Sequence, residues 1–383
     1  MYEIIHFVGL SGIGGVQRNF SEYIDTISSD DKLFNHKVYT LGSVDDQYNL
    51  PFCIHNIAKL KNFIFFIKSI ISNNTIVHLY NNLSSLKLAL LLLLIPANKL
   101  IVHERGTIWN QPTNKYLIPC FIAWKSTLIL ANSRATKTML VKKFSIIENK
   151  IKVLHNGISL KYKDKYIAHN INTKKRKIFT IGFIGRLDSP KGVHVLIESM
   201  RFLNGYDVIL KIAGDGVLEE NLRQSASSIK SIEFIGRVNS PYLFLDKIDL
   251  LVVPSIREPL GNVCLEAGLC KTPVLATNVD GIPEIIEHKI SGELIDATDE
   301  ISIDLPEGAV PLPEFVVNPV NQQLCTPKQI NPSLLAKKIL ELSSKPEKLK
   351  YYANELHTKV THYFNINRYR TELYNIYQEI YHL

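Results

Sequence analysis

Two glutamates eight positions apart, Glu258 and Glu266, are the residues whose types and spacing most clearly suggest chemistry. The apolar run Asp249 to Val253 before them reads as a strand. A Pro-Leu-Gly-Asn turn follows Glu258, a helix-like run carries Glu266, and the run Pro273 to Thr277 reads as the next strand. This order predicts a βαβ unit, and open α/β sheets bind ligands at such strand ends. Carboxylates there suit vicinal hydroxyls, because each accepts strong hydrogen bonds.

A second motif combines glycines with cations. The stretch Phe183 to Gly192 reads FIGRLDSPKG, in which Arg186 ends a predicted strand and Lys191 opens a predicted helix. Two cations at this position can neutralise a departing diphosphate, and the start of a helix itself favours anions. The structural alternative is that both are ordinary surface charges.

Glycine turns follow other predicted strands. In the stretch Gly12 to Arg18, Gly14 and Gly15 let the backbone approach an anion at the start of a helix. Gln17 stands where a GxGxxG fingerprint needs its third glycine, so a dinucleotide site is a poor match. A glycine turn that packs a helix against a strand explains the same residues without a ligand.

Taken in order, these motifs resemble the EX7E signature of retaining GT-B glycosyltransferases of the glycosyl transferases group 1 family, bacterial surface-polysaccharide type. The resemblance runs from Gly14 to about Pro283 and is most specific in residues 182–283. It implies transfer of a hexose-type unit from a nucleotide diphosphate sugar to an acceptor hydroxyl, with retention of the anomeric configuration. The acceptor implied is a glycan, such as a polyprenyl-diphosphate-linked one, in O-antigen or capsule assembly.

The resemblance also assigns roles to residues of this chain. Its catalytic set is His103, Glu258, Arg186 and Lys191. Its donor-binding set adds Gly14, Gly15, Gly214, Arg237, Val238, Leu260, Gly261, Asn262, Val263 and Glu266. Within these sets, Glu258 and the turn after it are expected to hold the sugar and its phosphate, and Glu266 to bind the ribose hydroxyls. A lone histidine such as His103 is more often structural, and that reading stays open.

Several other chemistries lack their motifs. The sequence has no DxD pair that presents itself as a metal site, and no HExxH, GxSxG, P-loop or CxxC pattern. The charge of the leaving group would then fall to Arg186, Lys191 and helix dipoles. We expect no metal and no cofactor besides the donor substrate.

The elements that must position these residues alternate along the chain. Strand-like runs in the first part are Glu3–Leu10, His36–Gly42, Asn74–Tyr80, Lys99–Gly106 and Ser126–Ser133. Helical stretches separate them, which predicts a doubly wound parallel sheet. Residues 161–177 are polar and basic like a linker, and a fresh α/β pattern follows.

The predicted fold class is therefore α/β, GT-B, with two Rossmann-like domains facing a central cleft. We predict an acceptor domain over residues 1–172 and a nucleotide-sugar donor domain over residues 173–362. A proline-rich irregular insertion occupies about 297–332, and a terminal helix over 363–383 crosses back onto the first domain.

Composition and charge narrow the class of protein further. The 383 residues are 46% hydrophobic and 21% charged, as in globular proteins. The five cysteines show no paired spacing, and no signal-peptide pattern is present, which predicts a reduced, cytoplasmic setting. Residues 1–177 hold 24 Lys and Arg against 10 Asp and Glu, whereas residues 178–383 hold 20 against 26.

A basic half predicts an anionic partner, which is an anionic membrane surface, a phosphate-bearing acceptor or nucleic acid. The alternative is an ordinary solvated lysine-rich surface without such a partner. The lack of nucleic-acid-binding motifs disfavours nucleic acid as the partner.

The run Leu86 to Ala97 is too short to span a bilayer and is predicted to be a buried helix. Lys59 to Ile71 mixes basic and apolar residues; a core-facing helix is preferred over a membrane-surface helix.

Three rival functions remain from the sequence. A GT-B sugar-nucleotide epimerase or hydrolase would act on the donor without an acceptor, but it is not expected to carry the EX7E turn. A non-catalytic nucleotide-sugar-binding protein would keep the site without turnover. An NAD-dependent dehydrogenase is the least supported, because the fingerprint around Gln17 is broken.

Overall fold

The computed structural model describes residues 2–12, 14–27, 33–46, 48, 50–161 and 178–382. These residues form two compact units, each described by itself. Unit 1 comprises Met1–Ile158 and Phe364–Leu383, and unit 2 comprises Ser159–Tyr363. The predicted boundary at 172/173 lies outside the described residues.

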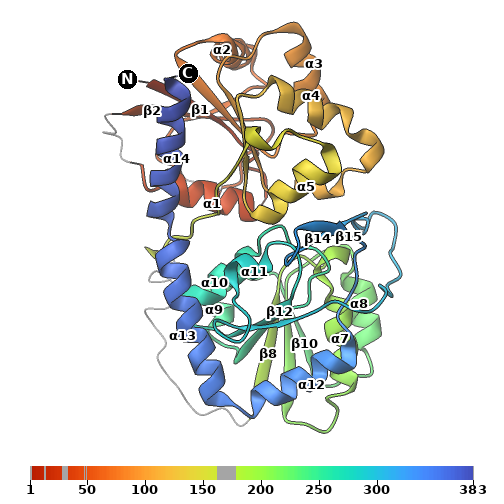
Figure 1. Ribbon diagram of the computed structural model, residues 1–383. Coiled ribbons are helices and arrows are strands. Elements are labelled where there is room, and N and C mark those ends of the chain that lie inside the picture. The colour runs from red at the N-terminus through yellow and green to blue at the C-terminus, as the bar shows by residue number, and fades with distance from the viewer. Residues whose placement is uncertain are drawn as a thin grey trace. The chain divides into compact units, whose positions relative to one another are not determined.

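Unit 1 is built on a seven-stranded parallel sheet in the order β3-β2-β1-β4-β5-β6-β7 (Figure 1). Its strands are β1 (Tyr2–Phe7), β2 (Phe34–Thr40), β3 (Ile54–Asn56), β4 (Thr75–Tyr80), β5 (Leu100–Glu104), β6 (Leu128–Ala131) and β7 (Ile151–Val153). Its α-helices are α1 (Gly15–Ile24), α2 (Leu60–Ile71), α3 (Leu86–Leu94), α4 (Leu117–Lys125), α5 (Arg134–Phe144) and α14 (Ile366–Tyr381). Short 3₁₀ turns lie at Thr107–Asn110, Thr113–Lys115 and Glu148–Lys150.

The C-terminal helix α14 completes the core of unit 1, where the sequence predicts a helix that crosses back. It begins at Asn365, whose side chain accepts a hydrogen bond from the Arg368 amide and so caps the helix. A Cβ atom on Gly157 would lie 2.8 Å from the Ile366 Cα, so only glycine permits this close approach. Tyr369 and Tyr377 are buried against the sheet. Residues far apart in the sequence thus share one core.

Unit 2 repeats the plan with a six-stranded parallel sheet in the order β10-β9-β8-β11-β12-β13. Its strands are β8 (Phe179–Ile184), β9 (Val208–Ala213), β10 (Ile232–Gly236), β11 (Leu250–Val253), β12 (Val274–Thr277), β13 (Glu293–Ile295), and the antiparallel pair β14 (Val316–Asn318) and β15 (Gln323–Cys325). Its α-helices are α7 (Val193–Arg201), α8 (Glu219–Ala226), α9 (Pro241–Leu245), α10 (Asn262–Cys270), α11 (Ile282–Ile285), α12 (Pro332–Ser343) and α13 (Pro346–Tyr363). A 3₁₀ turn lies at Ser189–Lys191.

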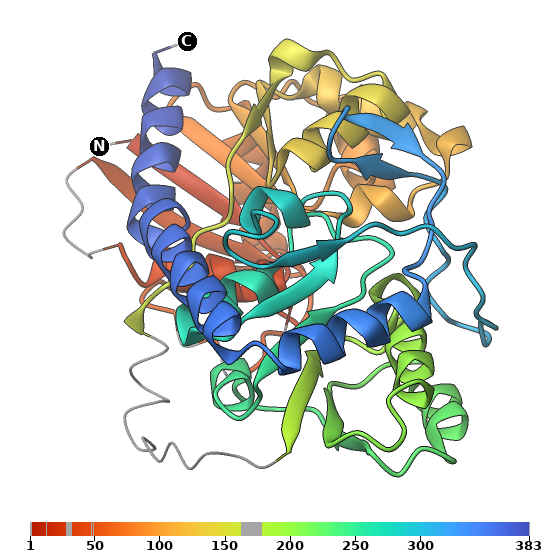
Figure 2. The same cartoon turned by 60° about the horizontal axis from the view of Figure 1, so that its bottom comes forward.

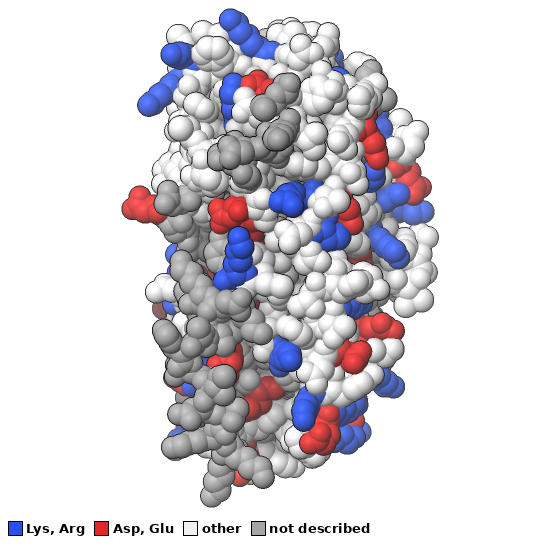
Figure 3. All heavy atoms as spheres, turned by 90° about the vertical axis from the view of Figure 1, so that its left-hand side faces the viewer, with Lys and Arg blue, Asp and Glu red and all other residues white. Residues whose placement is uncertain are grey.

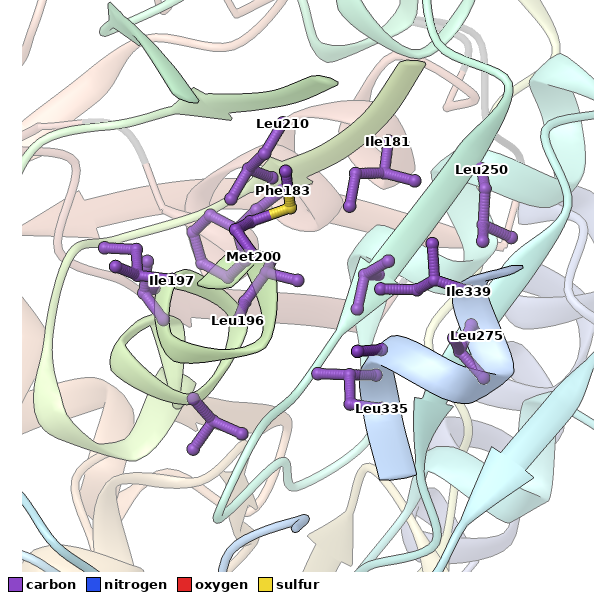
Figure 4. Packing of buried hydrophobic residues seen from close by; sticks show 14 of the residues in the cluster. Ile181, Phe183, Leu196, Ile197, Met200, Leu210, Leu250, Leu275, Leu335 and Ile339 are labelled. Carbon is purple, nitrogen blue, oxygen red and sulfur yellow. The ribbon is translucent and has the colours of Figure 1, made fainter. Parts of the chain in front are cut away.

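The core of unit 2 lies between its sheet and helices α7 and α12. Phe183 of β8 packs with Met200 of α7, and Leu275 of β12 lies near Leu335 and Ile339 of α12 (Figure 4). These strands are apolar on both faces because helices cover the whole parallel sheet. The apolar strand runs therefore hold the polar loops at their ends in fixed positions.

Two predictions about helices need correction. The run around α3 was expected to be buried, but Leu86, Leu90, Leu93 and Leu94 are exposed while Leu88 and Leu92 are buried. On α2, Phe66 and Ile70 face the core, as preferred from the sequence, but other apolar side chains of that helix do not. A helix that is apolar all round carries no pattern that tells its buried side from its exposed side.

Candidate functional site

The polar loops of unit 2 gather at the point where its strand order reverses. From β8 the chain crosses to β9 on one side, and β11 pairs with β8 on the other. Such a topological switch point leaves a crevice outside the carboxyl ends of the two strands, and open α/β sheets bind ligands there. The GRLDSPKG stretch follows β8 and the EPLGN stretch follows β11. The two motifs singled out from the sequence therefore flank the switch point.

An ion pair joins these two motifs. Lys191 Nζ donates a hydrogen bond of 2.6 Å to Glu258 Oε2, and Ser255 Oγ lies 3.4 Å from the same oxygen. The backbone supports the pairing, because the amides of Ile256 and Arg257 both donate to the Pro190 carbonyl. Glu258 is almost fully buried, whereas the Lys191 side chain keeps 30% of its surface exposed. The partly exposed Lys191 ammonium is thus held beside the buried Glu258 carboxylate.

Helix α10 begins directly behind this pair. Its N-cap, Gly261, has φ = 99°, a left-handed conformation that favours glycine, and no side chain caps this helix start. An uncapped helix N-terminus directs amide N–H groups and the positive end of the dipole outward, which favours an anion. Asn262 and Val263 are partly exposed at this start, and Leu260 is buried.

Glu266 lies one turn into α10 and is 8% exposed. The helix therefore places it on the buried side, close to but separate from Glu258. Cys264 lies between the two carboxylates, and burial, with a smaller contribution from Glu258, raises the pKa of its thiol far above the ordinary value. That thiol is neutral at any physiological pH and serves as packing.

Sequence reasoning missed Asp280, whose carboxylate holds the backbone of the turn at Glu258 through a hydrogen bond. Its carboxylate accepts hydrogen bonds from the amides of Glu258, at 2.9 Å, and Val317, at 2.6 Å. The residue is buried and has φ = 48°, an uncommon left-handed conformation for a side chain other than glycine. Burial raises the pKa of Asp280 to about 7 in spite of these two donors. The only sequence signal was an aspartate directly before the Gly281 turn.

Arg257 is the second residue that the sequence analysis missed. Burial lowers the pKa of its guanidinium, and the negative charges of Asp280, Glu258 and Asp188 oppose that shift. The positive charge of Arg186 also lowers the pKa of Arg257, because the two guanidinium groups lie near each other. The site thus contains three cations, with Arg257 in addition to the predicted Arg186 and Lys191.

The insertion at 297–332 is attached to the same loops. Val310 donates its amide to Asp188 Oδ1 at 3.2 Å and accepts a hydrogen bond from Ser189 Oγ. The hairpin of β14 and β15 is anchored through Val317, which bonds Asp280 in both directions. The irregular segment predicted from its prolines therefore contacts the loops after β8 and β12, beside the candidate site.

The remaining predicted donor residues of unit 2 lie at the same sheet edge. The amide of Gly214, after β9, donates to the Gly236 carbonyl, and Gly185 donates to Ala213. A Cβ atom on Gly214 would lie 1.8 Å from the Gly185 carbonyl oxygen, so the close packing of these loops requires glycine. Arg186 and Arg237 are exposed and Val238 is partly exposed. Their contact with a donor stays a prediction.

The predicted residues of unit 1 lie in two different environments. Gly14 precedes α1 and Gly15 begins it, in the loop after β1 at the switch point of that sheet. His103 lies one residue before the end of β5, in the interior, where its ring stacks on His78 and Tyr80. Burial, then the nearby Arg105 charge, lowers its pKa well below the ordinary value. Its approach to a sugar stays a prediction, and the structure shows it as a ring packed in the core of unit 1.

Within the described residues, no group of three or more His, Cys, Asp or Glu side chains could hold a metal ion. The expectation that the reaction needs no metal is not tested by this observation and stays a prediction.

Parts of this chain are similar in sequence to known proteins. Residues 164–304 match the family model described as glycosyl transferases group 1. The capsular polysaccharide biosynthesis glycosyltransferase CapM of Staphylococcus aureus is 29% identical over a stretch that covers 48% of this chain and 52% of CapM. The N-acetylgalactosamine-N,N'-diacetylbacillosaminyl-diphospho-undecaprenol 4-alpha-N-acetylgalactosaminyltransferase of Campylobacter jejuni is 30% identical, covering 51% and 53%. The chain spans about half the length of the curated relatives it matches.

Solved structures extend the likeness to the whole fold. HepE from Anabaena, solved in complex with UDP and glucose, matches with a TM-score of 0.74 at 16% identity, over 99% of this chain and 100% of HepE. Two parallel-sheet α/β units in one chain define the GT-B fold class, as predicted. The segment that matches the glycosyl transferases group 1 model lies within unit 2.

Proposed function

We propose that the chain is a retaining glycosyltransferase that moves a sugar from a nucleotide diphosphate sugar to a hydroxyl of an acceptor glycan. The observation that carries this proposal is the pairing of Lys191 with Glu258 at the switch point of unit 2, in front of the uncapped helix that contains Glu266. The family match over residues 164–304 and the capsular role in the name of CapM support it.

In the proposed arrangement the diphosphate lies at the start of α10, next to Lys191 and Arg186. Both cations and the helix dipole stabilise the negative charge that grows on the leaving phosphate. Glu258 orients the sugar through its hydroxyls, and Glu266 accepts hydrogen bonds from the ribose. Arg257 adds a further positive charge close to the Glu258 carboxylate.

The proposed step is a front-face displacement. The bond between the anomeric carbon and the phosphate oxygen breaks while the acceptor oxygen bonds to that carbon on the same face. The departing phosphate takes the acceptor proton, so charge and atoms balance without a protein nucleophile. Hexose transfer, retention and independence of metal are parts of this proposal.

A lipid-linked acceptor is the second part of the proposal. The name of the Campylobacter relative describes a diphospho-undecaprenol-linked substrate, and the basic first half of this chain suits a diphosphate-bearing acceptor. We place the reaction at the cytoplasmic face of a membrane, in assembly of capsule, O-antigen or a related polysaccharide.

A transfer assay tests the activity directly. The purified chain is incubated with UDP-sugars and GDP-sugars, with EDTA present, and with or without a short polyprenyl-diphosphate-linked glycan. We expect a product of higher mass only when the acceptor is present, and NMR of its new linkage should show the anomeric configuration of the donor.

The same assay separates the rival functions. Free sugar or a rearranged nucleotide sugar formed equally without acceptor would indicate a hydrolase or epimerase. Inversion at the anomeric carbon would contradict retention, and activity that EDTA abolishes and Mg²⁺ restores would contradict metal independence. Donor binding with no turnover for any acceptor would favour a non-catalytic binding protein.

A further inference from the structure

Helices α2, α3 and α4 lie on the same face of the unit 1 sheet. Each connects strands that advance in one direction along the sheet, from β3 to β4, β5 and β6, and right-handed crossovers place such helices on one face. Helices α3 and α4 contact each other, and the Asn98 amide donates to the Ile70 carbonyl at the end of α2 (Figure 1). The outward sides of the three helices therefore form one surface, here called the α2–α4 face.

The α2–α4 face exposes large apolar side chains in stripes. On α3, Leu90, Leu93 and Leu94 are 53%, 64% and 84% exposed, and they lie three or four residues apart, as one side of a helix requires. Leu60 on α2 and Trp124 on α4 are 73% and 66% exposed. A contiguous apolar patch on the surface of a globular protein marks a site of contact with another apolar phase.

The sequence that builds this face is rich in lysine and nearly free of acidic residues. Between Asp46 and Glu148 the sequence contains one acidic residue, Glu104, which is buried and accepts hydrogen bonds from the amides of Gly106 and Ile108. Exposed lysines lie on all three helices or next to them: Lys59, Lys61, Lys68, Lys87 and Lys115. By contrast, the left-hand side of Figure 1, drawn in Figure 3, shows Asp and Glu interspersed with Lys and Arg among its described residues.

Two lysines lie over aromatic rings at the edge of the patch. The Lys68 ammonium is 5.9 Å from the Phe65 ring centre, and the Lys125 ammonium is 5.0 Å from that of Trp124. Lysine stems that cover apolar surface while the ammonium reaches outward are typical of an apolar–water boundary with negative charge above it.

We infer that the α2–α4 face binds flat on an anionic phospholipid bilayer, with its leucines and Trp124 in the outer acyl region and its lysines at the headgroups. No helix in the described part of the chain is long and apolar enough to cross a membrane, so the contact is interfacial. A second copy of the chain fits this face less well, because two lysine-rimmed surfaces without acidic partners repel each other. The inference does not depend on the proposed enzymatic activity.

Vesicle co-sedimentation of the full chain tests this inference without donor or acceptor. Vesicles contain either phosphatidylcholine alone or phosphatidylcholine with phosphatidylglycerol. We expect strong binding only to the anionic vesicles, with a partition coefficient that falls as salt rises. Each of the substitutions Lys61→Ser, Lys68→Ser and Lys87→Ser should lower the coefficient about fivefold. The double variant Leu93→Glu/Leu94→Glu should lower it about tenfold or more.

A matched control uses Val320→Glu, because Val320 is 86% exposed and apolar but belongs to unit 2. This variant should bind anionic vesicles like the unaltered protein, and circular dichroism should show native folding for all variants. The inference is overturned if the unaltered protein ignores anionic vesicles or if Leu93→Glu/Leu94→Glu binds as well as Val320→Glu. Light scattering that shows a dimer which only the leucine variant dissolves would instead assign the face to a second copy.

Discussion

At the scale of single residues, two groups compete for Lys191. Its ammonium donates a hydrogen bond to the Glu258 carboxylate, and in the proposed function it also contacts the donor phosphate. Replacement by alanine removes one cation from the leaving group. We predict that Lys191→Ala lowers kcat by about 100- to 1,000-fold, the usual effect of removing one donor to a developing charge. Steady-state kinetics with the donor identified by titration provide the measurement. Lys350→Ala, an exposed lysine of unit 2, should leave kcat unchanged, and equal kcat in both variants would contradict the role of Lys191.

Asp280 gives a residue-scale prediction about pH. Burial raises its pKa to about 7, so the folded protein holds this proton more tightly than the unfolded chain does. The stability from that proton is complete below about pH 4 and is lost as pH rises through 7. Between pH 6 and pH 8 the wild-type protein should lose about 1.4 kcal/mol of unfolding free energy relative to Asp280→Asn.

Denaturant unfolding at the two pH values measures this difference, with the exposed Asp304→Asn as the control. Asp280→Asn should also be less stable at pH 8, because its amide group cannot accept from both the Glu258 and Val317 amides. A parallel pH dependence in wild-type protein and Asp280→Asn would show that another group titrates.

The residues that sequence reasoning could find were those next to apolar strand runs. Arg186 and Lys191 follow β8, Glu258 follows β11, and Glu266 lies one turn into the helix after it, so the structure places all four at one sheet edge. Asp280 could not be found this way, because its role depends on a backbone bond to Val317, a residue 37 positions away.

At the scale of elements, four histidines lie between the unit 1 sheet and its covering helices. They lie on neighbouring strands of the sheet. His36 on β2 stacks on His6 on β1, and His78 on β4 stacks on His103 on β5, whereas the His6 and His78 rings are tilted by 45°. His6 bonds His36 at 2.9 Å, and His78 bonds the Tyr377 hydroxyl of α14 at 2.7 Å. The row thus links the sheet to the C-terminal helix.

This row predicts that unit 1 is sensitive to acid. Burial lowers the pKa of His6, His78 and His103 well below 6.5. As pH falls, the unfolded chain therefore binds protons at these histidines before the folded chain does. Their contribution to stability is complete above pH 6.5 and is lost as pH falls below it, by up to about 1.4 kcal/mol per pH unit for each histidine.

Thermal unfolding between pH 7.5 and pH 5 measures this sensitivity. His78→Phe should reduce the slope of Tm against pH, even though it also loses the bond to Tyr377. His362→Gln, on the exposed surface, should keep the wild-type slope. An unchanged slope in His78→Phe would mean that this histidine is not among the groups that titrate.

The elements themselves were mostly predictable, and the exceptions have physical causes. Alternating apolar runs and turns predict parallel sheets because helices must cover both faces. The exposed side of α3 was not predictable, since LKLALLLLL has no polar stripe to mark the outward direction. The anchoring of the 297–332 insertion was equally hidden, because its contacts with Asp188 and Asp280 are made by backbone groups.

At the scale of the whole molecule, each of the two sheets presents a glycine-rich loop at a switch point, and in unit 2 the loops beside it combine cations with buried carboxylates. From the charge, the sequence predicted only an anionic partner for the basic residues 1–177. We propose that unit 2 binds the nucleotide sugar and that unit 1 contacts the acceptor and the membrane.

Glu266 provides the most direct test of this central claim. Calorimetric titration of the full chain with UDP, GDP, ADP, dTDP and CMP, without added metal, compares the unaltered protein with Glu266→Ala and with the exposed control Glu347→Ala. We predict that the unaltered protein binds one of these nucleotides clearly more tightly than the others. The binding free energy for that nucleotide should be weaker by about 1.5–3 kcal/mol in Glu266→Ala and unchanged in Glu347→Ala. No binding of any nucleotide, or equal dissociation constants in all three proteins, would contradict the assignment of the donor site to unit 2.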